Sequence, residues 1–122
     1  MSLISESRKL VDQAWQSPGT WDANYAAAEA LLRQALARTP DDPLTLTCLG
    51  AVLSDVGKHG EAASLLRRAV ELGSTDRNTF YNLGVALVNR GALKRGRSLL
   101  LKAAEMTASP ESWSAWFDPH GH

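Results

Sequence analysis

The chain contains a segment that matches the following segment at a fixed offset of 34 residues. Residues 43–76 align without a gap on residues 77–110, and 10 of the 34 aligned positions are identical. The identical positions are mostly small or apolar: Thr45/Thr79, Leu49/Leu83, Gly50/Gly84, Leu53/Leu87, Gly57/Gly91, Ser64/Ser98, Leu65/Leu99, Leu66/Leu100, Ala69/Ala103 and Glu71/Glu105. A period of this length is typical of repeat units that bury their apolar faces only by stacking on neighbours. The repeat therefore predicts a binding scaffold without identifying what it binds.

Both units share one internal spacing of large and small residues. The first unit has Leu46, Leu49, Gly50 and Leu53, then Ala62, Leu66 and Ala69. The second has Phe80, Leu83, Gly84 and Leu87, then Gly96, Leu100 and Ala103. This spacing resembles the tetratricopeptide repeat, with its aromatic-x-x-Leu-Gly-x-x-Tyr motif followed by Ala-x-x-x-Phe-x-x-Ala. The departures, among them Gly96 for the alanine and Ser74 and Ala108 for the usual proline, keep the size class.

A less regular unit precedes these two. One period earlier, the second-helix positions of the family fall on Tyr25, Ala28, Leu32, Ala35 and Pro40. The first-helix positions, where the family has small and large apolar residues, fall on Gln16 and Gly19 and do not match. The turn cluster at residues 17–20 explains the mismatch, because it lengthens the loop and displaces the helix before it. We therefore expect repeat 1 over about residues 3–40, repeat 2 over about 43–76 and repeat 3 over about 77–108.

The resemblance implies an all-α, right-handed α-solenoid of three antiparallel helix pairs in a single domain covering residues 1–122. Helices are expected over about residues 3–16, 20–38, 43–57, 59–72, 77–91 and 92–107. Thr20 or Asp22, Asp42 and Asp76 are the expected N-caps. Glycine accepts the left-handed backbone that closes a helix, so Gly57, Gly73 and Gly91 are expected helix ends.

The C-terminal residues carry a cluster of aromatic side chains. Ser109 and Pro110 suggest the start of another helix, over about residues 109–118, that ends at Asp118. It would present Trp113, Trp116 and Phe117. Repeat arrays need a terminal helix to cover the open end, so one interpretation is a capping helix. The alternative is that these aromatic residues protrude and bind another subunit, giving a homodimer.

Composition excludes several function classes. Acidic and basic residues number 13 each, so no overall field favours nucleic acid or an anionic membrane surface. Cys48 is the single cysteine, which excludes an intramolecular disulfide and fits a reducing compartment. The N-terminus lacks a signal-peptide core, so cytoplasm is the expected location. No motif for catalysis or a cofactor is present, and His120 and His122 are too few for a metal site.

The binding surface is assigned through the resemblance, which implies that the first helix of each pair lines a concave groove. On this register the candidate groove residues are Thr47, Ala51, Asp55, Asn78, Tyr81, Asn82, Val85 and Asn89. The asparagines can each donate and accept hydrogen bonds, which suits the backbone amides of a peptide. Tyr81 offers apolar area with a polar tip and is the expected anchor.

Three functions fit this surface. The first is an adaptor that binds a peptide or helix of a partner protein in the groove. The second is a client-specific chaperone or neutralising partner, and the third is a self-assembling structural module joined through the C-terminal aromatic residues. Family members that hold the carboxylate end of a chaperone tail use cations at positions that are Thr47, Ala51, Asn78 and Asn82 here, so that role is excluded. No enzymatic activity is expected.

Overall fold

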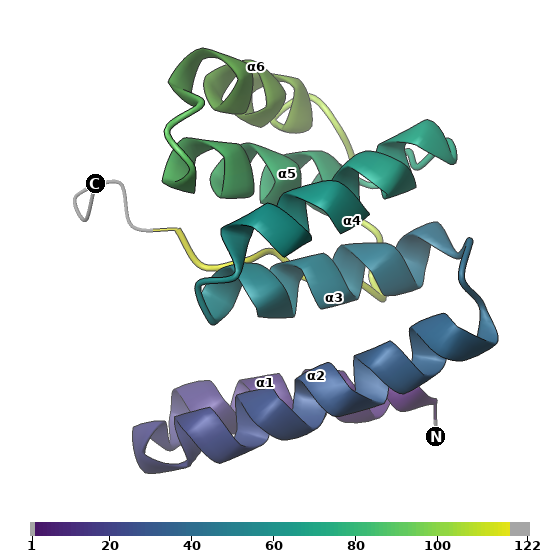
Figure 1. Cartoon of the computed structure of the whole chain (residues 1–122), viewed down its shortest axis with the longest axis vertical. Coiled ribbons are helices and arrows are strands. Elements are labelled where there is room, and N and C mark those ends of the chain that lie inside the picture. Colours follow the sequence, from purple (N-terminus) through teal and green to yellow (C-terminus); the bar gives the residue numbers. More distant parts are fainter. Residues whose placement is uncertain (1, 118–122) are drawn as a thin grey trace.

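Helices account for most of the computed structural model, which describes residues 2–117. Six α-helices follow in order: α1 (Leu3–Gln16), α2 (Trp21–Arg38), α3 (Pro43–Asp55), α4 (His59–Glu71), α5 (Arg77–Asn89) and α6 (Leu93–Ala103), with a short 3-10 turn, η1 (Pro18–Thr20), before α2. Figure 1 shows them as three successive pairs stacked along the long axis. The predicted all-α solenoid of three helix pairs is confirmed.

The helix ends follow the expected local chemistry at most positions. Asp42 and Asp76 are N-caps, and their carboxylates accept hydrogen bonds from the backbone N–H two residues later. Gly57, Gly73 and Gly91 have positive φ, as the end of a helix requires. The predicted Thr20 cap is different, because its Oγ1 donates to the Ser17 carbonyl at 2.7 Å and makes no capping bond to α2.

Helices α5 and α6 pack closely against each other at two glycines, Gly84 and Gly96. A Cβ built at Gly84 would lie 2.9 Å from the Gly96 carbonyl oxygen and 2.9 Å from Leu100 Cγ. One built at Gly96 would lie 2.6 Å from Val88 Cγ2. Side chains at these positions would hold the helices apart, so the small residues that recur in the sequence set the distance at which the pair packs.

The first pair joins the stack differently from the other two. Inner helices α3 and α5 pack on each other, and the hydroxyls of Thr47 and Thr79 meet between them at 2.6 Å. Helix α1 packs chiefly on α2 and does not pack closely on α3 in the same way. Between residues 2 and 117, no helix is long and apolar enough to cross a membrane.

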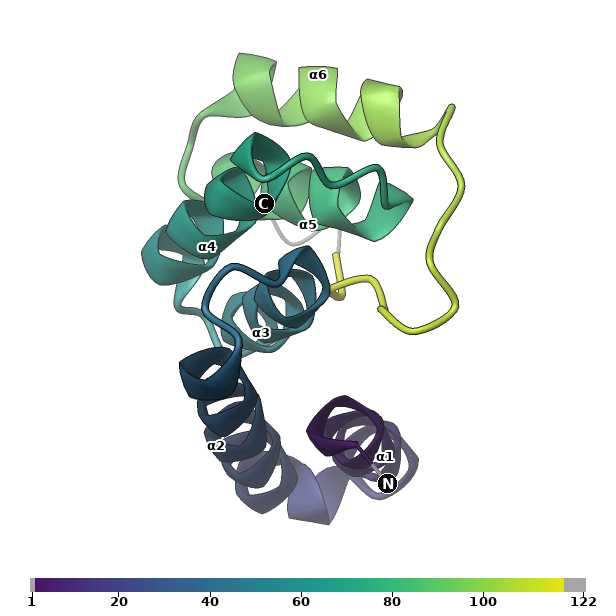
Figure 2. The ribbon, with the colours of Figure 1, turned by 90° about the vertical axis from the view of Figure 1, so that its right-hand side faces the viewer.

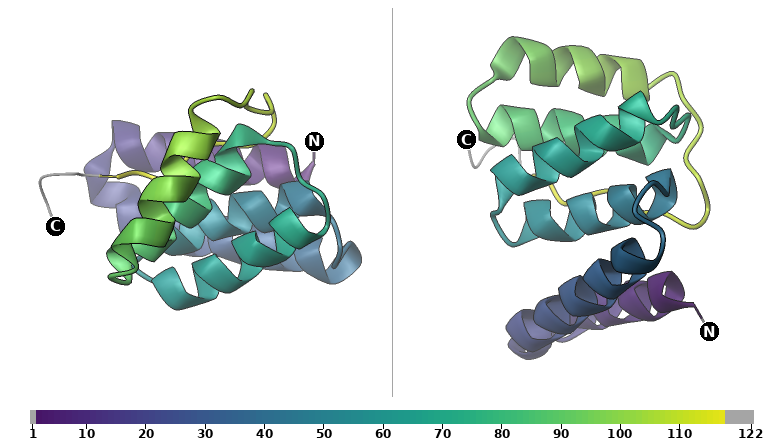
Figure 3. Two further views of the ribbon diagram at one scale, coloured as in Figure 1. Left: turned by 90° about the horizontal axis from the view of Figure 1, so that it is seen from above. Right: turned by 45° about the vertical axis from the view of Figure 1, so that its right-hand side comes forward.

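The segment after α6 departs from the prediction. Helix α6 ends at Ala103, although a helix to about residue 107 was expected. A further helix was expected over about residues 109–118, but residues 109–117, the part of this range that the structure describes, are not helical. Instead residues 104–117, here called the tail, turn back across the stack. In Figure 2 the tail runs from the end of α6 against α5 and α3, and the right panel of Figure 3 shows the same return path. Asp118, His120 and His122 lie outside the described residues.

Candidate functional site

Asp76, the N-cap residue of α5, also binds the first half of the tail. Asp76 caps α5 through the Asn78 N–H, and the same carboxylate accepts from the Ser109 N–H at 2.9 Å and from the Ser112 hydroxyl at 2.5 Å. The Arg77 N–H donates to the Thr107 carbonyl at 3.1 Å. One acidic side chain therefore both starts a helix and anchors the returning chain.

Asn82 holds the backbone of the tail with both ends of its amide. Its Nδ2 donates to the Trp113 carbonyl at 3.1 Å, and its Oδ1 accepts from the Ala115 N–H at 2.7 Å. Asn78, one turn earlier on α5, donates to the Ser112 hydroxyl at 2.9 Å. Both bonds of Asn82 go to main-chain atoms, so this contact does not depend on the side chains of the bound segment.

Asp55, at the end of α3, completes the set of backbone contacts. Its Oδ1 accepts from the Trp116 N–H at 2.8 Å, and its Oδ2 accepts from the Tyr25 hydroxyl at 2.6 Å. Tyr25 in turn accepts from Trp15 Nε1 at 2.9 Å. Burial raises the pKa of Asp55 to about 6, although both hydrogen bonds oppose this by favouring the charged form.

Trp113 fills the space between α1 and the inner helices. Its side chain is 7% exposed and belongs to the hydrophobic core, together with Val11 of α1 and Ala115 of the tail. Its indole Nε1 is buried without a hydrogen-bond partner, which costs part of the gain from burial. The tail thus supplies the packing between α1 and α3 that a direct helix contact supplies between α3 and α5.

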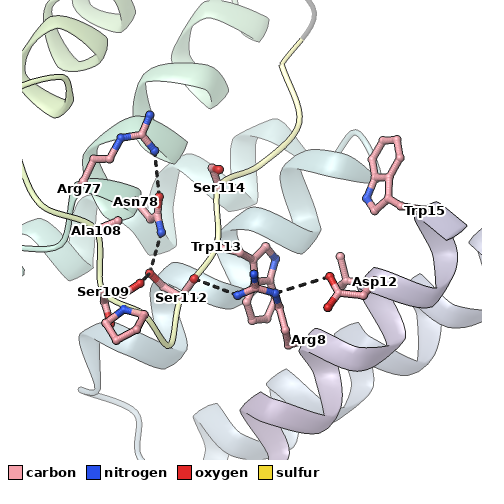
Figure 4. A pocket seen from close by; sticks show the side chains of 12 residues that line it. Arg8, Asp12, Trp15, Arg77, Asn78, Ala108, Ser109, Ser112, Trp113 and Ser114 are labelled. Atoms are coloured by element: carbon pink, nitrogen blue, oxygen red, sulfur yellow. Dashed lines mark hydrogen bonds and ion pairs between the residues drawn. The ribbon is translucent and has the colours of Figure 1, made fainter.

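A pocket of about 490 Å³ opens between α1, the start of α5 and the tail. Figure 4 shows Arg8 among the lining residues, where it donates to the Ser112 carbonyl at 3.2 Å and pairs with Asp12 at 3.6 Å. The Arg8 guanidinium also lies 5.5 Å from the centre of the Trp113 ring. Arg77, on the other side, donates to Asn78 Oδ1 at 3.1 Å. Both arginines bring positive charge to a groove in which the sequence analysis expected none.

The eight candidate groove residues fall into two groups. Five are buried: Thr47, Ala51, Asn78, Asn82 and Val85. Three keep exposed surface: Asp55, Tyr81 and Asn89. Thr47 lies between α3 and α5, and the two asparagines face the tail, so in this conformation the groove already contains a peptide segment of its own chain. Tyr81, the expected anchor, stacks under the Arg77 guanidinium at 4.5 Å.

The three aromatic residues proposed for a subunit interface differ in how far they are exposed. Trp113 is buried and is therefore not available on the surface, whereas Trp116 is 57% exposed and Phe117 is half-buried. The tail covers part of the inner face, not the open end of α6, so the expected position of the cap is also wrong. Arg8 and Trp15, which have no motif around them, were not predicted from the sequence, and Tyr25 was predicted only as a packing position of the first repeat. Asp76 was found only as a helix cap.

Comparison with known proteins supports the repeat assignment. A family model described as Tetratricopeptide repeat matches residues 44–73, which span most of α3 and all of α4. No curated protein sequence matches the chain.

Solved structures of the same architecture extend the likeness to most of the chain. An O-GlcNAc transferase mutant from Thermobaculum terrenum is 31% identical with a TM-score of 0.64, over 86% of this chain and 20% of the transferase. The Sgt2 TPR domain from Aspergillus fumigatus is 24% identical with a TM-score of 0.63, over 87% of this chain and 71% of that domain. This chain thus spans only a fifth of the transferase.

Proposed function

We propose that this chain, whose residues 44–73 match the tetratricopeptide repeat and whose fold is that of a protein-interaction module, binds an extended segment of a partner protein along α3 and α5. The observation that carries the proposal is the two-bond contact of Asn82 with the backbone at Trp113 and Ala115. The tail is a bound peptide in all respects except its covalent link to α6. A partner segment would take its place.

The contacts of the tail define what such a segment needs. Asp76, Asn82 and Asp55 bind hydroxyl or main-chain groups along the tail. The core adds one strong side-chain preference, a large aromatic residue at the position of Trp113, followed by a small residue at the position of Ala115. Arg8 and Arg77 favour an acidic or phosphorylated group beside it. The proposal assigns no catalytic role to any of these residues.

The test uses the tail itself as the probe. A chain ending at residue 106 is mixed with a synthetic peptide of residues 107–117, and binding is followed by isothermal titration calorimetry. We expect saturable binding that Asn82→Ala weakens at least about tenfold, because two hydrogen bonds to the peptide are lost. Asn24→Ala is the matched control, since the exposed Asn24 side chain at the start of α2 donates to the Thr20 hydroxyl, away from the tail. A shortened chain that is helical by circular dichroism yet does not bind the peptide contradicts the proposal.

A second candidate function follows from the same contact. If the groove accepts the tail of its own chain, it also accepts the tail of another copy, and exchange of tails would join two chains. This is the self-assembly alternative, with Trp113 buried in the partner copy and not packed on its surface. Light scattering over a concentration series tests it: a monomer at every concentration excludes exchange, whereas a dimer that Asn82→Ala dissociates supports it.

A further inference from the structure

A second cleft lies where α1 ends, α2 begins and the tail passes the end of α3. It has a volume of about 350 Å³ and is lined by Trp15, Trp21, Asp55 and Trp116. We call it the tryptophan cleft. Trp15 and Trp116 are 49% and 57% exposed, although large aromatic side chains are usually covered. The proposed peptide groove uses only the backbone N–H of Trp116, so it does not explain why these indoles gather here.

The three indoles are held in place by one hydrogen-bonded pair, Tyr25 and Asp55. Trp15 Nε1 donates to the Tyr25 hydroxyl, and the Trp21 ring stacks on the Tyr25 ring with centroids 4.1 Å apart and planes at 19°. The Trp116 backbone is fixed by its bond to Asp55. Trp15 and Trp116 face each other with centroids 6.3 Å apart and planes at 33°. The walls of the cleft are therefore ordered before any ligand binds.

Three aromatic rings outside the cleft have a cationic side chain of this chain over them. Arg8 lies over Trp113, Arg77 over Tyr81, and Lys102 over Phe80 at 4.8 Å. None of these three cations lies over the indoles of the cleft. One face of Trp21 is covered by Tyr25, but the exposed indole surfaces of Trp15 and Trp116 can be reached by a cation from outside the chain.

The carboxylate in the cleft, that of Asp55, is held by neutral donors. Arg8, Arg33, Lys58 and Arg68 form their ion pairs with other carboxylates, those of Asp12, Glu29, Glu61 and Asp41. The two hydrogen bonds of Asp55 come from Tyr25 and Trp116. A partly buried negative charge compensated only by neutral donors is stabilised by a cation that enters the same cleft.

We propose that the tryptophan cleft binds a quaternary ammonium group, either on a free solute or on a methylated lysine side chain. Such a group has a positive charge with an apolar surface, which matches walls made of indole rings around a carboxylate. A primary ammonium is strongly hydrated and needs hydrogen-bond acceptors. The Asp55 oxygens already accept bonds from Tyr25 and Trp116, so the cleft favours the methylated cation.

Nuclear magnetic resonance of the four indole N–H groups tests the site in the full chain, with choline as the probe. We expect the Trp15, Trp21 and Trp116 signals to shift and saturate, while the Trp113 signal stays in place as an internal control. The neutral isostere 3,3-dimethyl-1-butanol has the same shape without the charge. Equal binding of the two compounds, equal shifts of all four signals, or no shift with choline would each overturn the proposal.

Two variants and a second probe complete the experiment. Trp116→Leu keeps an apolar wall and Asp55→Asn keeps an acceptor for the Trp116 N–H, so both retain the fold while weakening choline binding at least about tenfold. Unchanged affinity in both variants contradicts the site. Acetylated trimethyllysine amide, compared with its unmethylated form, identifies the source: tighter binding than choline indicates a modified protein, and weaker binding indicates a free solute.

A negative result for choline binding in the tryptophan cleft can be told apart from a negative result for peptide binding in the groove. The tryptophan cleft requires a docked tail because Trp116 forms one wall, whereas partner binding in the groove requires the tail to leave. Choline binding is measured on the full chain and peptide binding on the chain ending at residue 106. Each result therefore stands without the other.

Discussion

Two interfaces between inner helices differ in what fills them. Between α3 and α5 the helices touch directly, and the Thr47 and Thr79 hydroxyls meet at 2.6 Å. Between α1 and α3 the tail intervenes, with Trp113 in the core and Arg8 bound to the Ser112 carbonyl. The first interface is made by sequence-adjacent repeats, and the second needs a segment about 100 residues away. A groove that holds its own chain can hold another, which is why we propose the α1–α3 side as the binding side.

The largest expected effect comes from removing the side chain that fills the α1–α3 interface. Trp113→Ala should lower the free energy of unfolding by about 3 kcal/mol, because a buried indole is lost and the tail is released. Hydrogen exchange should rise in α1 and at residues 107–117 while α5 and α6 stay protected. Trp113→Phe is the control: it keeps most of the ring and removes the unpaired Nε1, so it should cost less than half as much. Equal exchange throughout the chain would show that the two interfaces are not independent.

At the opposite end of the stack, a larger residue at Gly84, where α5 contacts α6, should lower the stability of the α5–α6 pair. Gly84→Leu should cost about 2 to 3 kcal/mol, because any Cβ there meets the Gly96 carbonyl and Leu100. Urea denaturation measures the loss. Gly19→Ala is the matched substitution, since a Cβ at Gly19 has no heavy atom within 4 Å. Were Gly84→Leu as stable as Gly19→Ala, direct helix packing would not set the stability of the α5–α6 pair.

A smaller effect is expected when only the backbone contact of the tail is removed. Asn82→Ala leaves the Trp113 carbonyl and the Ala115 N–H without their partners, and should cost about 2 kcal/mol. The same change combined with Trp113→Ala should add little, because both act by releasing the tail. Full additivity in a double-mutant cycle would mean that Asn82 stabilises something other than the docked tail.

The smallest effect is a pH dependence carried by Asp55. Its pKa in the folded chain is raised to about 6 and lies above that of an exposed aspartate, so the folded state holds the proton more tightly than the unfolded state. The free energy of unfolding should therefore fall as pH rises from about 4 to 6 and change little above about 7. Asp55→Asn should flatten this part of the stability curve. A curve of the same slope in the variant would assign it to another group.

Local sequence predicted the parts of the fold that depend on near neighbours. The 34-residue period gave the helix pairs, and Asp42, Asp76, Gly57, Gly73 and Gly91 gave their ends. It did not predict the path of the tail. Ser109 and Pro110 resemble a helix start, but a helix of two turns is barely stable alone. The bonds from Asp76, Asn82 and Asp55 satisfy the same backbone groups in an extended conformation.

The sequence by itself determined a stack of paired helices, because the repeated small and apolar residues permit one kind of packing. Tertiary structure alone decided what the inner face contains. It brought Arg8, Asp55, Asn82 and Trp113 together from four segments that no short motif connects. The physical reason is that repeat packing depends on residues close together along the chain. The position of the tail depends instead on whether residues 109–117 form a helix or bind the groove in a non-helical conformation. That choice is settled only when all the helices are in position.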